Sequence, residues 1–374
     1  MSPDPFPRAE VRIDLDLIRH NLALLAGRAA ASGAATMAVV KADAYGHGAV
    51  PVARAALEAG ATWLGACSLA EALTLREAGI QAPMLAWLDT ADTDYTPAIA
   101  AGVDLGLSNA GELERAASAA RRAGGRARVH LKIDTGLSRN GCPPHAWPAL
   151  VKSAAADSAV EVVGIWSHLA CADEPGHPSI DAQASRFQQA YDVALEAGLH
   201  PMRHLANSAA TLTRPDLHFD LVRVGIAMYG LNPVPQPEDL RPAMTFRSSV
   251  VSTKRVDAGE SVSYGHTWTA EAATTLALVP AGYADGVPRT LSGRLDVWLD
   301  GRRRPVVGRV CMDQIVVDCG DHEPAPGTEV VLFGSGEGGA PTATEWADKI
   351  GTIDYEIVTG MCRPRVARSY TGQR

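Results

Sequence analysis

The chain has 374 residues, of which 47% are hydrophobic and 20% are charged, and its formal net charge is -8. This length favours two domains. The negative charge argues against a nucleic-acid surface, and no basic run carries interleaved aromatic residues. No apolar run reaches the ~20 residues that a membrane-spanning helix needs, and no secretory signal opens the chain. We therefore expect a cytoplasmic protein that binds neither nucleic acid nor a membrane.

The six cysteines show none of the spacings that metal sites use. No C-x-x-C pair is present, and a chain of this length can build its core without disulfides. We therefore predict reduced thiols and no metal ion.

Short apolar runs alternate with amphipathic stretches from about residue 11 to Gly230. Eight of the runs predict β-strands, at residues 37–41, 62–67, 84–88, 103–107, 129–133, 162–168, 204–207 and 221–224. Helical stretches lie between most of them. Ser68 with Glu71, and Asn109 with Glu112, have the spacing of helix N-terminal caps.

Eight β/α units predict an α/β fold, a closed parallel (β/α)8 barrel of the TIM type. A doubly wound open sheet is the alternative, but no G-x-G-x-x-G opens a helix. After a proline-rich connector the pattern changes to alternation and turn signals, which predict a mostly-β domain with strands at 248–256, 276–279, 295–299, 306–310, 315–317 and 330–333. We place the barrel at 12–240 and the β domain at 241–374, joined by an N-terminal strand within 1–11.

Lys41 ends the first predicted strand and is one of only five lysines in the chain. It follows three consecutive apolar residues. A lysine that is desolvated there has a lowered pKa and can form a Schiff base with an aldehyde cofactor. A solvated lysine is the alternative from this stretch alone.

Polar side chains also mark other strand ends, where barrels carry their chemistry. They are His130, Lys132, Asp134, His168, Asn207, Ser208 and Arg223. Period-2 alternation turns His130, Lys132 and Asp134 inward, and a buried ammonium is costly unless it is paired or modified. Singly, these residues could be a core histidine, a helix cap or a buried ion pair. Their agreement across strand ends predicts an active site.

Nine segments, in matching order, resemble the motifs of alanine racemase, a family of pyridoxal-phosphate (PLP) enzymes with an N-terminal barrel and a C-terminal β domain. They are Val39–Gly48, Lys132–Gly136, Ser167–Ala170, Ala206–Ser208, Arg223–Ile226, Tyr264–Gly265, Gly282–Gly286, Arg309–Gln314 and Tyr355–Glu356. The resemblance covers nearly the whole chain.

The resemblance implies a set of cofactor contacts. Lys41 would hold PLP as a Schiff base, and Arg223 would face its pyridine nitrogen. The phosphate would be held by Tyr45, Ser208, Gly225, Ile226 and Tyr355.

The resemblance also implies how substrate is bound. Arg139 would approach the cofactor's phenolic oxygen and the substrate carboxylate. Lys132, often carbamylated in this family, would position Arg139. Met312 and Asp313, together with Tyr264, would reach the cofactor of the other subunit in a head-to-tail homodimer.

Two acid/base groups on opposite faces are needed to invert the substrate carbon. By resemblance Lys41 serves the D side and Tyr264 the L side, with His168 contacting Tyr264 and linked to Arg223. The implied function is interconversion of L- and D-alanine, supplying D-alanine for peptidoglycan. A racemase of broader specificity (serine and alanine), a PLP amino acid decarboxylase of the same fold and a non-enzymatic PLP carrier are the alternatives.

Overall fold

The computed structural model describes residues 7–236 and 238–373. By its internal contacts the chain divides into two compact units. Of the described residues, 18–44, 48–236 and 238–240 form the barrel unit, and 7–17, 45–47 and 241–373 form the C-terminal unit.

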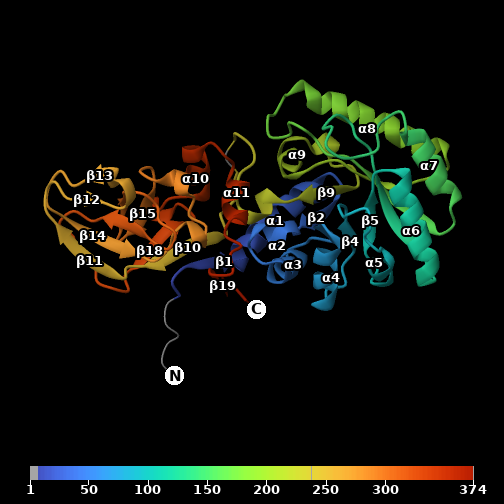
Figure 1. The fold of residues 1–374 in the computed structure, drawn as a ribbon. Coiled ribbons are helices and arrows are strands. Elements are labelled where there is room, and N and C mark those ends of the chain that lie inside the picture. The colour runs from blue at the N-terminus through green and yellow to red at the C-terminus, as the bar shows by residue number, and fades with distance from the viewer. Residues whose placement is uncertain (1–6, 237, 374) are drawn as a thin grey trace. The chain divides into compact units, whose positions relative to one another are not determined.

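Eight parallel strands form the sheet of the barrel unit, so the predicted fold class is confirmed (Figure 1). Their order is β8-β7-β6-β5-β4-β3-β2-β9. The two end strands approach each other through backbone hydrogen bonds, from Asp220 N to Arg203 O (3.1 Å) and from Arg223 N to Ala206 O (2.9 Å). The strands are β2 (Ala35–Val39), β3 (Trp63–Ala66), β4 (Met84–Ala86), β5 (Asp104–Leu107), β6 (Ala127–Lys132), β7 (Val160–Trp166), β8 (Met202–His204) and β9 (Leu221–Val224).

Helices alternate with these strands, and the predicted caps begin two of them. The Ser68 side chain and Glu71 form a capping box, and Asn109 Oδ1 accepts from Glu112 N at 2.9 Å. The Ser68 and Asn109 side chains each accept from an amide in the first turn that has no acceptor within its own helix. The helices are α1 (Leu15–Ala31), α3 (Ala49–Glu58), α4 (Leu69–Glu77), α5 (Thr96–Ala100), α6 (Ala110–Ala123), α7 (Trp147–Ala156), α8 (Pro178–Glu196) and α9 (Ser208–Thr213).

The predicted inward orientation of alternate residues holds in β6 only up to Lys132, where the strand ends. His130 and Lys132 are buried at 0% and 5% exposure. The inward placement of Asp134 is wrong, because β6 ends at Lys132. Its carboxylate instead accepts from the amides of Gly136 (2.9 Å) and Ser138 (3.1 Å) in the following loop.

The C-terminal unit is built on a nine-stranded sheet, which confirms the mostly-β prediction. Its order is β11-β14-β17-β16-β15-β18-β10-β1-β19, with the N-terminal strand β1 antiparallel to β10 and parallel to β19. The strands are β1 (Glu10–Asp14), β10 (Met244–Ser249), β11 (Ser252–Val256), β14 (Thr274–Val279), β15 (Asp296–Leu299), β16 (Arg302–Val307), β17 (Ile315–Asp318), β18 (Glu329–Phe333) and β19 (Ala367–Thr371), besides a short pair, β12 (Ser261–Val262) and β13 (Trp268–Thr269).

The single strand predicted at 248–256 is wrong. β10 pairs with β1 and β18, whereas β11 pairs with β14 at the far end of the sheet. The chain changes partners at Val250, whose amide donates to Thr328 O at 2.9 Å. Alternation of side chains continues through such a break, so the sequence pattern could not show it.

Two helices of the C-terminal unit, α10 (Ala343–Ile350) and α11 (Asp354–Thr359), were not predicted. A local signal for α10 existed, because Thr342 Oγ1 accepts from Glu345 N at 3.1 Å. The helix buries Trp346 against Phe333, with ring centroids 5.0 Å apart. No helix of the described residues is long and apolar enough to cross a membrane.

Gly46 lies against α11, and we expect Gly46→Ala to destabilise the C-terminal unit. Gly46 has φ +82°, and an added Cβ would meet Val358 O at 2.4 Å. Gly79 has the same φ of +82° with nothing within 4 Å, so Gly79→Ala is the matched control. The control should cost about 1 kcal/mol for the strained backbone, and Gly46→Ala about 2 kcal/mol more because of overpacking. Urea unfolding measures both, and equal losses would contradict the contact with α11.

Candidate active site

A left-handed helical turn, α2 (Lys41–Tyr45), follows β2 and carries the candidate Schiff-base lysine. Ala42, Asp43, Ala44 and Tyr45 have φ between 51° and 54°. Left-handed helical geometry costs about 1–2 kcal/mol for each residue that has a Cβ. Such a turn persists only where surrounding contacts hold it.

Glu71 supplies such contacts from the first turn of α4. Its Oε1 accepts from Ala42 N at 2.8 Å, and its Oε2 accepts from Cys67 N at 2.7 Å. One carboxylate therefore ties the residue after Lys41 to the end of β3. The sequence indicated Glu71 only as a helix cap. The spacing of Ser68 and Glu71 predicted the bond between these two residues. Nothing in the sequence pattern predicted the bond from Ala42 N to Glu71.

We expect Glu71→Ala to lower the free energy of unfolding by about 2–3 kcal/mol, because charge-assisted hydrogen bonds to strained backbone are lost. Glu77→Ala, at an exposed position of the same helix, is the control and should change stability by less than about 0.5 kcal/mol. Chemical denaturation compares the two. A Glu71→Ala protein as stable as the control would show that Glu71 does not hold the turn.

Two lysines in the barrel unit, the partly buried Lys41 and the buried Lys132, have lowered pKa values. Burial lowers the pKa of Lys41, and the charges of Arg139 and Arg223 lower it further, against an opposing influence of Cys67. Burial, Arg223 and Arg139 lower the pKa of Lys132 to about 8. The Lys132 ammonium lies 4.4 Å from the centre of the Trp166 ring. Both amines are therefore more easily deprotonated than an ordinary lysine.

The lowered pKa of Lys132 predicts a pH-dependent stability. Between about pH 8 and 10.5 the unfolded chain keeps this proton and the folded chain has lost it. The unfolded state then binds more protons, so stability rises with pH in this window. In CO2-free buffer, Lys132→Met should be more stable than wild type near pH 7. This advantage should shrink by about 3 kcal/mol by pH 10.5. Urea unfolding across this range measures it, and a constant difference would contradict the shift.

Arg223 is buried in β9 and is held mainly by backbone carbonyls. Its guanidinium donates to Ser167 O (2.7 Å), His204 O (2.7 Å) and Leu205 O (3.2 Å). Burial lowers its pKa to about 9, so it remains a cation at neutral pH.

His168 Nδ1 lies 3.4 Å from the Arg223 guanidinium. Burial, together with the charge of Arg223, holds the pKa of His168 well below its usual value. This imidazole is therefore neutral at pH 7 and can accept from Arg223 through Nδ1.

A group of hydrogen-bond donors lies where α9 and β9 meet. The Ser208 hydroxyl accepts from Gly225 N at 2.8 Å and from Ala227 N at 3.4 Å. Ile226 begins the 3-10 helix η2 (Ile226–Tyr229). Because the Ser208 oxygen accepts both of these bonds, its O–H can donate to an anion such as a phosphate.

The C-terminal unit places two predicted tyrosines together. The rings of Tyr45 and Tyr355 have centroids 6.1 Å apart. Tyr355 lies on α11, so its position depends on a helix that the sequence pattern did not predict.

Tyr264 and Met312 are exposed in the same unit, at 71% and 52%. Tyr264 lines a pocket with His266, Cys311 and Gln314. Asp313 is not free, because its carboxylate pairs with Arg365 at 2.7 Å.

The family model for the alanine racemase N-terminal domain matches residues 13–233, and the model for the C-terminal domain of the same family matches residues 243–370. The chain belongs to the alanine racemase family. Alanine racemase from Salinispora arenicola is 57% identical to it over 372 residues, covering 98% of this chain and 99% of the relative. The enzyme from Thermobifida fusca is 55% identical over 370 residues, covering 97% and 98%.

Solved alanine racemases share the fold along the chain. The enzyme from D-cycloserine-producing Streptomyces lavendulae superposes with a TM-score of 0.95 at 50% identity and covers 99% of each chain. The enzyme from Streptomyces coelicolor gives a TM-score of 0.95 at 52% identity over 98% of each chain. At these identities the similarity extends beyond the barrel fold, which unrelated enzymes also use.

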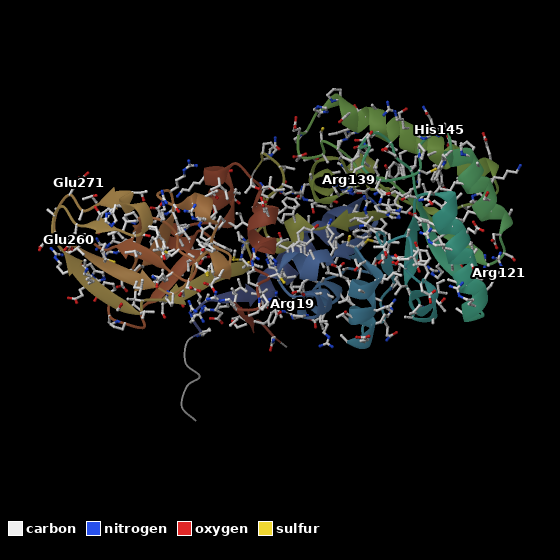
Figure 2. The ribbon with its side chains drawn as sticks, in the orientation of Figure 1. Arg19, Arg121, Arg139, His145, Glu260 and Glu271 are labelled. Carbon is white, nitrogen blue, oxygen red and sulfur yellow. The ribbon has the colours of Figure 1, made fainter. Side chains whose placement is uncertain are left out.

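Within the barrel unit of this alanine racemase family member, the predicted basic site residues lie on β6 and β9 and just after β2 and β7, and their charges influence one another's pKa values. Arg139, labelled in Figure 2, is an exposed residue of the loop after β6. Its charge lowers the pKa values of Lys41, Lys132 and His168. The barrel therefore gathers the predicted basic residues at strand ends, while Tyr45, Tyr264, Met312, Asp313 and Tyr355 belong to the C-terminal unit.

Proposed function

We propose that this chain interconverts L-alanine and D-alanine and so supplies D-alanine for peptidoglycan. The observation that carries this function is a match along nearly the whole length to racemases that are more than half identical. In addition, Lys41 follows a barrel strand and has a lowered pKa. The carboxyl ends of the strands are where such barrels hold their reactive groups.

PLP is the cofactor that we propose. Lys41 would bind its aldehyde, and Ser208, Gly225 and Ile226 would bind its phosphate. The Ser208 oxygen accepts from the amides of Gly225 and Ala227, so its O–H can donate to a phosphate, and the Gly225 amide would exchange this bond for one to the phosphate. When bound, the cofactor supplies an electron sink that makes the Cα proton of an amino acid removable.

Tyr45 and Tyr355 would add phenol donors to the phosphate. Their ring pair supports a shared role. Arg223 would donate a hydrogen bond to the ring nitrogen of the cofactor without transferring its proton, because a guanidinium holds its proton at neutral pH.

Two groups would move the Cα proton. Lys41 would act on D-alanine, and its lowered pKa leaves more of the amine as a free base. Tyr264 would act on L-alanine. A phenol with a pKa near ~10 is a poor base at neutral pH, so Tyr264 needs a neighbouring donor, a role that we give to His168.

Arg139 would bind the substrate carboxylate and the phenolic oxygen of the cofactor. We propose that Lys132 is carbamylated, which converts a buried cation into an anion able to position Arg139. The pKa of about 8 supports this modification, because the neutral amine is the form that reacts with CO2. A carbamate would also be attracted by the two arginines that destabilise an ammonium there.

A second copy of the chain would complete each site in a head-to-tail homodimer. Tyr264, Met312 and Asp313 of the partner subunit would reach this cofactor. The exposure of Tyr264 and Met312 supports the proposal, since clustered exposed hydrophobic residues mark interaction surfaces. Tyr283 is also exposed. Its amide donates to Cys311 O at 2.9 Å, so the loops that carry Tyr283 and Met312 adjoin each other.

The cytoplasm is the location that we propose. All six cysteines are free thiols, which fits a reducing compartment.

Exchange of the Cα proton in heavy water tests the function. Purified protein loaded with PLP should incorporate deuterium into both alanine enantiomers and bring either one to a racemic mixture, as followed by NMR and chiral chromatography. L-Serine under the same conditions tests the breadth of specificity, and we expect slower exchange. No exchange from either alanine enantiomer would contradict the proposal.

A further inference from the structure

A line of buried polar side chains runs from Arg223 through the interior of the barrel unit. Arg223 Nη1 lies 3.3 Å from His204 Nδ1, and His204 Nε2 lies 2.8 Å from His130 Nδ1. His130 Nε2 lies 3.2 Å from Asp104 Oδ2. All four residues are at most 5% exposed. They come from β5, β6, β8 and β9. Of the four, only Arg223 has a role in the proposed reaction, and Asp104, His130 and His204 have none.

The two ends of this line fix the position of every proton in it. A guanidinium can only donate and a carboxylate can only accept. His204 Nδ1 must therefore accept from Arg223, which leaves the proton of His204 on Nε2. That nitrogen donates to His130 Nδ1, so His130 also carries its proton on Nε2 and donates to Asp104. Both rings are neutral in this arrangement.

The charges of the two ends agree with this direction. Burial acts to raise the pKa of Asp104, but hydrogen bonds from His130 and Arg128 hold it below its usual range. The carboxylate is therefore ionised at neutral pH. Burial, with the neighbouring His130 and Arg223, holds the pKa of His204 well below its usual value, which keeps that ring neutral.

The packing leaves the two imidazoles little freedom to turn. The Trp166 ring stacks on His204 at 5.7 Å with an interplanar angle of 6°. The rings of Trp63 and His130 form a T-shaped pair, with centroids 5.5 Å apart and an interplanar angle of 77°. A Cβ at Gly164 would come within 2.3 Å of His130 Nδ1, so only glycine leaves room for this ring beside β7.

Arg223 lacks a direct anionic partner among the described residues. Its guanidinium bonds to three backbone carbonyls and two histidine rings. A buried cation without a counter-charge is costly. The carboxylate that it reaches is Asp104, through the two imidazoles. Asp104 also binds Arg128 at 2.8 Å at the other end of the line.

We propose that Asp104, His130 and His204 are positioning residues. Beside the three backbone carbonyls, they complete the hydrogen bonding that orients the Arg223 guanidinium, with two neutral, Nε2-protonated imidazoles behind it. The inference rests on the proposed function only for the group that Arg223 faces. If His204 carried its proton on Nδ1, two N–H groups would oppose each other and Arg223 would be displaced. The line thereby fixes which N–H groups of Arg223 remain available to the cofactor.

Ring 15N shifts of histidine-labelled holoenzyme test the wild-type protons directly. His204 and His130 should each show a protonated Nε2 and an unprotonated Nδ1 at pH 7. His218 is an internal reference, because its Nε2 faces Thr211 O at 3.0 Å and must be protonated there. A proton on Nδ1 of His204 or His130, or a positively charged ring, would overturn the proposal. This measurement needs no variant and no activity.

Asp104→Asn then tests the counter-charge, because asparagine keeps the shape and loses the charge. We expect kcat to fall about ten- to a hundredfold, as for other outer-shell partners, with KM for alanine nearly unchanged. The absorbance of the bound cofactor should shift, and the Nε2 proton of His204 should become mobile. Glu161→Gln removes a second carboxylate partner of Arg128, 3.3 Å away, without touching the line, and should change none of these.

Identical spectra, kcat and His204 shifts in Asp104→Asn and Glu161→Gln would overturn the role of Asp104. The two proposals fail separately. If the protein racemises alanine but His130 or His204 is not protonated on Nε2, only the positioning role is rejected. If both rings are protonated on Nε2 but alanine is not racemised, only the proposed function is rejected.

Discussion

Lys41→Ala should lose racemisation of alanine in both directions. The substitution removes the amine that we propose to bind the cofactor and to move the proton of D-alanine, so two roles disappear together. We expect kcat/KM to fall by about 10⁴-fold or more, as when a principal catalytic group is removed. Deuterium uptake at Cα in heavy water, followed separately for each enantiomer by NMR, measures the loss.

Lys152→Ala is the matched control for Lys41→Ala, because Lys152 is an exposed lysine of α7. It should exchange both enantiomers at the wild-type rate. The absorbance of bound cofactor provides a second reading, since Lys41→Ala should release PLP on dialysis and the control should retain it. Retained exchange of both enantiomers in Lys41→Ala would remove Lys41 from the mechanism.

Tyr264→Phe should affect the two enantiomers unequally. Phenylalanine keeps the ring and removes the hydroxyl that we propose to act on L-alanine. General acid–base groups contribute about 10²–10⁴-fold, so exchange from L-alanine should fall by that factor. Exchange from D-alanine, which Lys41 would carry out, should fall much less. Initial rates of deuterium uptake from each pure enantiomer give both numbers.

Tyr191→Phe is the control for a lost hydroxyl. Tyr191 lies on α8, where its ring packs against Arg203 at 4.8 Å, and that contact does not need the phenol. Its two exchange rates should equal those of wild type. An equal fall from both enantiomers in Tyr264→Phe would contradict the assignment of one base to each face, even if overall activity were low.

The eight barrel strands and several helix starts were predictable from the sequence, because their signals are local. Apolar periodicity marks a strand wherever it will be buried, and Ser68 with Glu71 caps α4 through residues three positions apart. The C-terminal unit was harder. Its long alternating run crosses a change of pairing partner at Val250, and α11 presents too short a periodic stretch to stand out.

A parallel barrel followed by a β domain, with Lys41 after one barrel strand and Arg223 on another, could be inferred from local patterns in the chain. The contacts that hold these two side chains appear only in the folded protein. Glu71 holds the left-handed turn after Lys41 from the first turn of α4, and Asp104 reaches Arg223 through two histidines. Residues far apart in the chain make these hydrogen bonds. Periodicity and caps report only on neighbours along the chain, so they carry no information about such contacts.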